Sequence, residues 1–202
     1  NSFLNCYCES SAQYEYDEDI LNVTLGSLNN TSDCSTTAGA GSVINQYSNF
    51  TGITAPLLSR GVSYPLAVEV GSCFSSYTNF TKVYIDYNQN GVFSDPGEEV
   101  FVSGEEYGDN TQASSITIPL SAALGTTRMR VITAQVYDPS DITPCGNYGY
   151  GETEDYLVTI EVAPACAQPT AIVWLSGTTT SATFSWTAGG TETQWIAQYG
   201  AP

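Results

Sequence analysis

The sequence contains no histidine and only four lysine and arginine residues. The absence of histidine excludes Ser-His-Asp and Cys-His catalysis and the usual ligand sets of zinc enzymes. It leaves a carboxylate-only enzyme, such as a glycosidase, open. Because basic residues are so few, 21 acidic residues give a net charge of −17. We therefore expect no binding to nucleic acid and repulsion from anionic membranes, whereas divalent cations would relieve the self-repulsion.

Long apolar runs are also lacking, so we expect no membrane insertion. No signal peptide is visible, and we expect Asn1 to be a mature N-terminus. The six cysteines form no CxxC pair, and without histidine a scattered, even set indicates disulfides and an oxidising, extracellular location. Six cysteines allow about 15 connectivities, among which the sequence alone does not choose. Free buried thiols are the alternative interpretation.

Short β-rich runs separated by turn residues fill most of the chain, and helical patterns are almost absent. The spacing predicts an all-β protein, an antiparallel β-sandwich of the jelly-roll or immunoglobulin-like kind. The expected strands are residues 20–28, 62–70, 81–87, 99–102, 115–119, 127–136 and 155–162. Residues 32–61 are expected to form loops with one weak strand. The acidic run at residues 15–19 is either a solvated face or a second cation site.

The composition changes at residues 163–169, which read as a linker. We expect one domain over residues 1–162 and a second, partial β-sandwich domain over residues 170–202. The second part is too short for about seven strands, so its tryptophans should pack against protein beyond residues 1–162. Either the natural chain continues, or these strands complete another subunit in a filament.

Oxygen-bearing side chains recur at alternate positions in residues 86–99, between two strand-like runs. This is the opening of the calcium loop D-x-[DN]-x-[DN]-G, with Gly91 at the turn. Because Ca²⁺ takes about six to eight oxygen ligands, the chain must curl around it. The predicted ligands are Asp86, Asn88, Asn90, the carbonyl of Val92, and Asp95 or Glu98. The flanks are strand-like, so the loop is not an EF-hand; a solvated Asn/Gly turn is the alternative.

Several motifs occur in the order of one known family. Residues 148–156, YGYGETEDY, resemble the signature of the GEVED domain family, with Thr153 in place of valine. Residues 83–91 resemble its calcium-like loop, and residues 125–131, GTTRMRV, resemble one of its strands. Tyr7-Cys8 and residues 22–26 resemble its opening and first strand. Residues 181–186 are similar to the start of a fibronectin type III domain.

This resemblance implies an extracellular accessory module of large secreted proteins from one Gram-negative phylum, which often use the type IX secretion route. The family is better known beside secreted peptidases and adhesins than for chemistry of its own. Cys8 and Cys145 stand at positions that resemble the recurrent cysteines of the family, so we pair them. The further expected pairs are Cys34 with Cys73, and Cys6 with Cys166.

Two of the four basic residues, Arg128 and Arg130, share one face of an expected strand. Glu152 and Glu154 would share a face if their segment is extended. We expect cross-strand ion pairs between these arginines and glutamates, in preference to a catalytic carboxylate pair.

Three hypotheses for function follow. The first is a non-catalytic, calcium-stabilised module of a cell-surface adhesin or filament protein, which acts in adhesion or assembly with other domains or subunits. The second is an ancillary domain of a secreted peptidase or glycosidase. The third is a sugar-binding module that uses exposed aromatic faces on a glycan.

Overall fold

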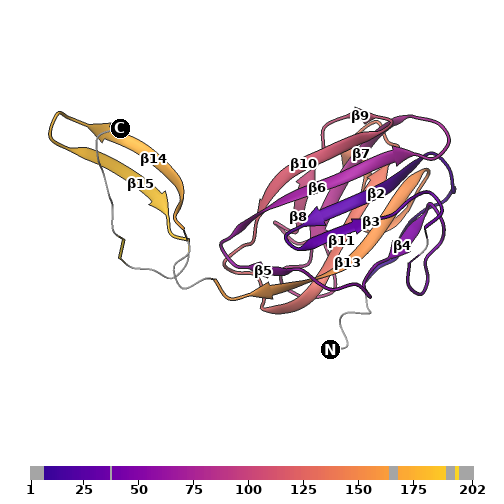
Figure 1. Cartoon of the computed structure of the whole chain (residues 1–202), viewed down its shortest axis with the longest axis horizontal. Coiled ribbons are helices and arrows are strands. Elements are labelled where there is room, and N and C mark those ends of the chain that lie inside the picture. Colours follow the sequence, from indigo (N-terminus) through magenta and orange to yellow (C-terminus); the bar gives the residue numbers. More distant parts are fainter. Residues whose placement is uncertain (1–6, 37, 164–167, 190–193, 196–202) are drawn as a thin grey trace.

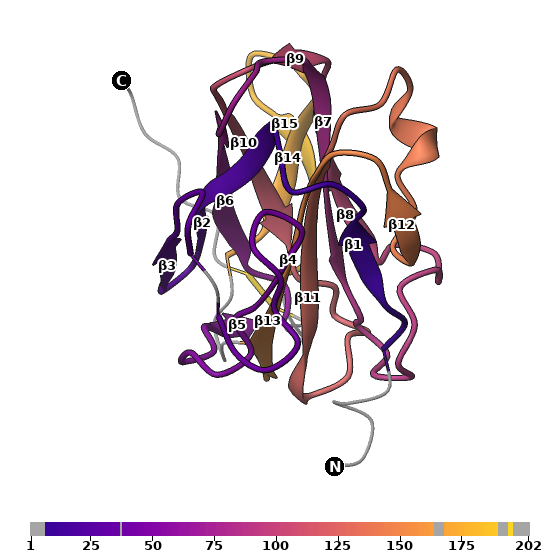
Figure 2. The same cartoon turned by 90° about the vertical axis from the view of Figure 1, so that its right-hand side faces the viewer.

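Alternating apolar residues build the strands of this fold. In β2 (Glu18–Leu25), Val23 and Leu25 are fully buried while Asn22 and Thr24 are half-buried. This period of two gives each strand one apolar face, which a second sheet must cover. The computed structural model describes residues 7–36, 38–163, 168–189 and 194–195, and it forms a two-layer β-sandwich followed by a separate hairpin (Figures 1 and 2).

The first sheet is antiparallel and has the order β10-β6-β2-β3, with β10 at Asn110–Thr117, β6 at Ser63–Ser72 and β3 at Leu28–Thr31. The second has the order β4-β13-β11-β7-β8. Its strands are β4 (Tyr47–Asn49), β13 (Gly151–Glu161), β11 (Gly125–Ala134), β7 (Thr78–Ile85) and β8 (Glu99–Val102). The short strands β5 (Leu57–Ser59) and β9 (Glu106–Tyr107) pair with β13 and β7. β1 (Ser10–Ala12) pairs with β12 (Gly146–Tyr148), and one 3-10 turn, η2, spans Pro139–Asp141.

The main core lies between the two sheets, where side chains such as Val68 of β6 meet Met129 of β11 and Tyr156 of β13. A second, smaller cluster around Phe93 and Ile132 covers the outer face of the second sheet. We call the end of the sandwich where β2, β7 and β13 begin the tip, and the end where β7 and β13 finish the linker end. The loop at residues 86–98 therefore lies at the linker end.

The predicted antiparallel β-sandwich is confirmed, and each of the seven expected strands corresponds to an observed one, with shifted bounds in all but β8. Residues 32–61 hold two short strands, β4 and β5, rather than one. Both pair in parallel with β13, whereas β10, β6, β2, β3, β13, β11, β7 and β8 pair with one another in antiparallel order. None of the described residues belongs to a helix long and apolar enough to cross a bilayer.

The hairpin of β14 (Thr170–Gly177) and β15 (Ala182–Thr187) forms beyond the sandwich. All residues of both strands are exposed. The backbone after β15 comes close to the sandwich at Gly61. A Cβ added at Gly61 would lie 2.2 Å from the carbonyl oxygen of Gly189. The division into two domains stays a prediction, and most of the expected linker, residues 164–167, lies outside the described residues.

Candidate functional site

Asp86 organises the predicted calcium loop from its first position. Its Oδ1 accepts hydrogen bonds from the backbone N–H groups of Gln89 (2.7 Å) and Asn90 (3.2 Å), and its Oδ2 accepts from the N–H of Gly91 (2.9 Å). The hydroxyl of Tyr7 donates to the same Oδ2 at 2.6 Å. Since a carboxylate offers about four acceptor positions, this buried group is fully used in folding the loop. Gly91, with φ of +89°, makes the turn that the motif requires.

Asn88 and Asn90 both point toward Asp95. Their side-chain amides donate to Oδ2 of Asp95 at 2.7 and 2.6 Å, and these hydrogen bonds lower the pKa of Asp95. Their own oxygens accept backbone N–H groups, from Asn90 and Val92 respectively, both at 3.0 Å. The loop is thus curled by its own polar side chains around an acidic centre.

Glu98 contributes the least satisfied group of the loop. Its side chain is buried, and Oε1 accepts a long hydrogen bond from the N–H of Asn88 at 3.3 Å. Oε2 is buried without a hydrogen-bond partner among the described residues, and so is the hydroxyl of Tyr87. Burial raises the pKa of Glu98 to about 7. Burying an oxygen without a hydrogen-bond partner costs free energy, and a ligand bound to Glu98 would offset this cost.

A cavity of about 380 Å³ lies beside these groups. Its lining includes Tyr87, Asn88, Asp95, Glu98 and Ser121. A hard cation such as Ca²⁺ takes carboxylate, amide and hydroxyl oxygens, and this lining supplies all three. Asn88, Asp95 and Glu98 are predicted ligands that share the cavity. Tyr87 was missed because it stands at a position of the motif that any residue can occupy, and Ser121 was missed because it lies outside the loop. The full ligand set stays a prediction.

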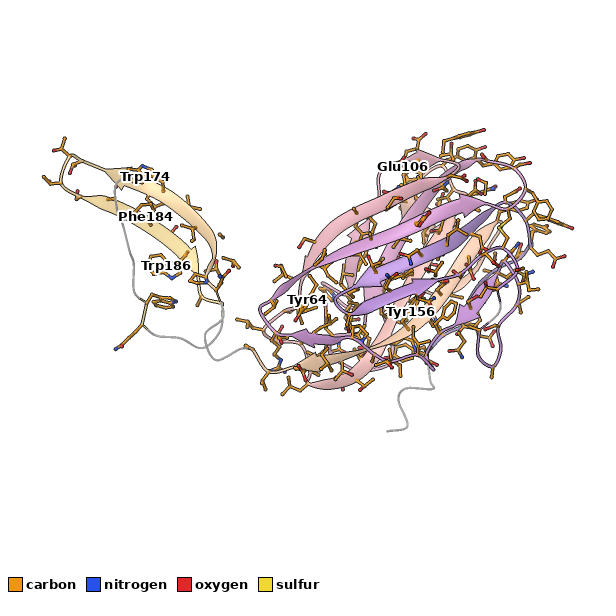
Figure 3. All side chains as sticks on the ribbon, in the orientation of Figure 1. Tyr64, Glu106, Tyr156, Trp174, Phe184 and Trp186 are labelled. Carbon is orange, nitrogen blue, oxygen red and sulfur yellow. A yellow bond between two sulfur atoms is a disulfide. The ribbon has the colours of Figure 1, made fainter. Side chains whose placement is uncertain are left out.

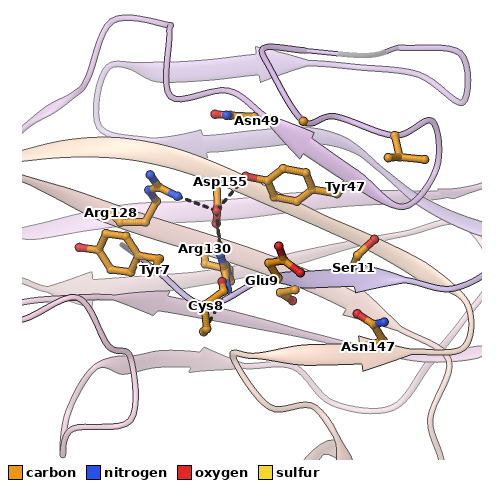
Figure 4. Close-up of a pocket in the computed structure, with 13 residues that line it drawn as sticks. Tyr7, Cys8, Glu9, Ser11, Tyr47, Asn49, Arg128, Arg130, Asn147 and Asp155 are labelled. Carbon is orange, nitrogen blue, oxygen red and sulfur yellow. Dashed lines mark hydrogen bonds and ion pairs between the residues drawn. The ribbon is translucent and has the colours of Figure 1, made fainter. Parts of the chain in front are cut away.

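The two arginines occupy the outer face of the second sheet (Figure 4). Arg130 donates from Nε to Oδ1 of Asp155 at 2.7 Å and from Nη2 to Oδ2 at 2.8 Å, while Arg128 donates from Nη1 to Oδ2 at 2.8 Å. The hydroxyl of Tyr47 also donates to Asp155, and the Tyr7 ring lies under the Arg128 guanidinium at 4.7 Å. These groups line a cavity of about 460 Å³.

The expected ion pairs of Arg128 and Arg130 with Glu152 and Glu154 are therefore wrong. The register sets Asp155 opposite Arg130 but places Glu154 opposite Val131 and Glu152 opposite Thr133. The glutamates face the interior of the sandwich, on the other side of the strand from the arginines. The prediction that these acids are structural, however, agrees with their many hydrogen bonds.

Glu152, Glu154 and Asp19 form a buried acidic group near the tip. Glu152 accepts from the Ser48 hydroxyl at 2.6 Å and from the N–H of Ile20 at 3.1 Å, and Glu154 accepts from the Tyr156 hydroxyl at 2.6 Å. Burial is the main cause that raises the pKa of Glu152 well above its usual range and that of Glu154 to about 8. At neutral pH, protons on these carboxyl groups remove the cost of burying their charge.

Two of the expected disulfides are confirmed. Cys8 is bonded to Cys145, which fixes the N-terminal segment over the outer face of the second sheet, and Cys34 is bonded to Cys73. The carboxylate of Asp19 lies near the second bridge, but both sulfurs are engaged in the disulfide, so this group does not form a metal site. The expected pair of Cys6 and Cys166 lies outside the described residues.

Comparison with known proteins supports the resemblance seen in the motifs. Residues 80–159 match the family model described as the GEVED domain. The match includes most of β7, the loop at residues 86–98, β11 and most of β13. No curated protein matches the chain. The similarity of the C-terminal residues to a fibronectin type III domain stays a prediction.

Two solved structures resemble the chain distantly. A Niemann-Pick type C2 protein from the Japanese carpenter ant is 6% identical, with a TM-score of 0.42 over 74% of this chain and 97% of that chain. The CARDB domain of a protein from Pyrococcus furiosus, in complex with di-metal ions, is 9% identical, with a TM-score of 0.34 over 80% of this chain and 97% of that chain. Similarity at this level carries no argument about function.

Proposed function

We propose that this chain, which carries a GEVED domain at residues 80–159, is a non-catalytic extracellular module that calcium stabilises. In this proposal it belongs to a cell-surface or filamentous protein and acts in adhesion or assembly. The observation that carries the calcium part is that neither the buried Oε2 of Glu98 nor the hydroxyl of Tyr87 has a hydrogen-bond partner among the described residues. Both border one cavity with Asn88 and Asp95.

The role of calcium would be to hold the loop, not to catalyse a reaction. Glu98, Asp95 and Asn88 would supply oxygens to the ion, while Asp86 would keep the backbone curled from behind. Binding to the folded state alone raises the free energy of unfolding by RT ln(1 + [L]/Kd), which is about 2.7 kcal/mol at a calcium concentration of 100 Kd.

Calcium titration with a matched pair of variants tests this role. We expect the wild-type protein to release or absorb heat on calcium addition in calorimetry and to melt at a lower temperature with excess chelator. Glu98→Gln should lose both responses, whereas Glu161→Gln, which removes one exposed carboxylate outside the loop, should keep them. A melting temperature that is insensitive to both calcium and chelator would refute the proposal.

Two further observations support an extracellular part in an assembly. The Cys8–Cys145 and Cys34–Cys73 bridges suit an oxidising compartment. Trp174, Phe184 and Trp186 of the hairpin are between 40% and 58% exposed and lie away from the sandwich (Figure 3). A two-stranded sheet is marginal alone, so we propose that the hairpin packs against another protein domain or subunit.

A further inference from the structure

Exposed aromatic side chains gather at the tip of the sandwich. The register fixes which residues meet there: Glu18 pairs with Ser72, and Ala134 pairs with both Phe80 and Gly151. The loops next to these positions carry six aromatic residues that are about half exposed or more: Tyr14 (51%), Tyr16 (47%), Phe74 (67%), Tyr77 (48%), Tyr107 (67%) and Tyr137 (97%). Figure 3 marks this end by Glu106, far from the tryptophans of the hairpin.

Three of these tyrosines surround one pocket. Tyr77, Tyr107 and Tyr137 line a cavity of about 350 Å³ together with Thr78, Gln135 and Val136. The pairing of β9 with β7 sets Tyr107 opposite Thr78, so two of the rings stand on hydrogen-bonded strands or directly beside them. A cavity of this size is at the lower end of the range for small-ligand sites.

Two lining residues of the pocket, Tyr77 and Gln135, are held in place by Glu18. This buried carboxylate accepts the backbone N–H of Tyr77 at 2.7 Å and a short hydrogen bond from the side-chain amide of Gln135. Gln135 also donates its backbone N–H to the carbonyl of Tyr150. The pocket therefore rests on a fixed framework, which reduces the entropy that a ligand must overcome.

The chemistry of the lining selects the class of ligand. The described lining residues are aromatic, aliphatic, amide or hydroxyl side chains, and none is charged, although the chain has 21 acidic residues. A tyrosine ring offers an apolar face and a hydroxyl that forms hydrogen bonds. A sugar ring has the matching parts, a face of C–H groups and an edge of hydroxyl groups.

The loops around the pocket carry acidic residues, which disfavour anionic ligands. They also carry further aromatic side chains. The exposed acids Glu15, Asp109 and Asp138 in the tip loops should repel anionic glycans. Two ring pairs stand in the neighbouring loops: Tyr16 with Phe74 and Tyr14 with Tyr150, each with ring centroids 4.9 Å apart. Aromatic side chains in several tip loops suit a chain of sugars better than a single sugar.

We propose that the tip binds a neutral polysaccharide, with sugar rings stacked on Tyr77, Tyr107 and Tyr137 and hydrogen-bonded to Gln135 and Thr78. This inference rests on the proposed function, because it names the partner in adhesion. In this proposal the two ends of the sandwich have different functions: the tip binds the ligand, and the loop that calcium stabilises lies at the linker end.

Binding to a defined panel of polymers tests the inference. Native gels that contain laminarin, xylan, mannan or hydroxyethyl cellulose would measure retardation of the full chain, followed by calorimetry with oligosaccharides of any polymer that retards it. Heparin and polylysine serve as the anionic and cationic probes. We expect retention by at least one neutral polymer and none by heparin. Absence of retention by every neutral polymer, or retention by polylysine alone, would overturn the inference.

Variants locate the binding surface. Tyr107→Ala and Tyr137→Ala should each weaken binding about tenfold or more, and the double variant should abolish it. Leu124→Ala, which removes an exposed apolar side chain at the linker end, should bind as the wild type does. Equal binding by the double variant would contradict the assigned site.

Measuring the calcium-dependent melting temperature of the same variants separates the two proposals. Tip variants that lose sugar binding should keep their response to calcium. If the calcium response is present but no neutral polymer binds, only the carbohydrate inference fails; if sugar binds without any calcium response, the calcium part of the proposed function fails instead.

Discussion

Arg130 and Asp155 face each other across β11 and β13, and two parallel hydrogen bonds of 2.7 and 2.8 Å join them. Both side chains are almost completely buried. The remaining nitrogen of Arg130, Nη1, donates to the backbone carbonyls of Cys8 (3.0 Å) and Pro144 (2.6 Å). The pair therefore connects the second sheet to the two segments that the Cys8–Cys145 bridge also joins.

The first prediction concerns removal of the charge on Asp155. Asp155→Asn should lower the free energy of unfolding by about 3–5 kcal/mol, because it leaves the buried guanidinium of Arg130 without its carboxylate. Glu99→Gln breaks the pair with Lys82, in which the glutamate side chain is 44% exposed, and should cost no more than about 1 kcal/mol. Urea denaturation of both variants measures the difference. Equal losses would show that burial does not decide the strength of these pairs.

The second prediction concerns pH. The pKa of buried Glu154 is raised to about 8, so its contribution to stability is complete below the pKa of the unfolded chain and is lost as pH rises through 8. Without calcium, the free energy of unfolding should fall between pH 5.5 and 8.5 by an amount on the order of 2–4 kcal/mol. Glu154→Gln should reduce this fall, and the part that remains is expected from Glu98 and Glu152, whose pKa values burial also raises. A wild-type stability that rises over the same range would contradict the prediction.

The third prediction concerns Gly151, in the segment that resembles the family signature. Gly151 has φ of +121°, and a Cβ there would lie 2.0 Å from the carbonyl oxygen of Thr133 on β11. Gly151→Ala should therefore cost about 3 kcal/mol or more. Gly149→Ala, two residues earlier, meets no atom within 4 Å and should change stability by no more than about 0.5 kcal/mol. Thermal melts of the two variants provide the comparison, and similar melting temperatures would refute it.

The fourth prediction concerns the two disulfides. Replacing Cys8 and Cys145 by serine opens a loop of 137 residues, and replacing Cys34 and Cys73 opens one of 39. On chain entropy alone the losses are about 5 and about 4 kcal/mol. The first should be larger still, since Arg130 donates to the carbonyl of Cys8. Denaturation of the two double variants measures both losses, and a smaller loss for the first pair would contradict this order.

The strands of the sandwich could be predicted because apolar and polar residues alternate along them, as in β2, where Thr24 separates Val23 from Leu25. The short strands β4 and β5 could not, since three residues carry too little pattern and both are defined by their pairing with β13. The partner of the arginines depended on register. A shift of one residue exchanges the faces of β13, so Asp155 lies outside with the arginines while Glu152 and Glu154 lie inside.

The sequence predicted only part of the candidate calcium site. The spacing of the loop motif predicts Asn88 as a ligand and leaves Asp95 and Glu98 as alternatives for the closing carboxylate, and these three side chains line one cavity. Whether a carboxylate is already occupied depends on contacts from distant residues, such as the hydroxyl of Tyr7 on Asp86. That the hydroxyl of Tyr87 is buried without a hydrogen-bond partner in the described part of the chain likewise becomes known only from the fold.

The position of β13 has a mechanical consequence. This strand runs the length of the sandwich from the tip to the linker end, held by ten residue pairs with β11 on one side and by β4 and β5 on the other. A force applied through the segment after Glu161 would pull β13 along its own axis. Its hydrogen bonds would then be loaded in shear and share the tension, rather than open one after another like a zipper. A ligand held at the tip would thus be connected to the rest of the protein through the strand best placed to resist traction.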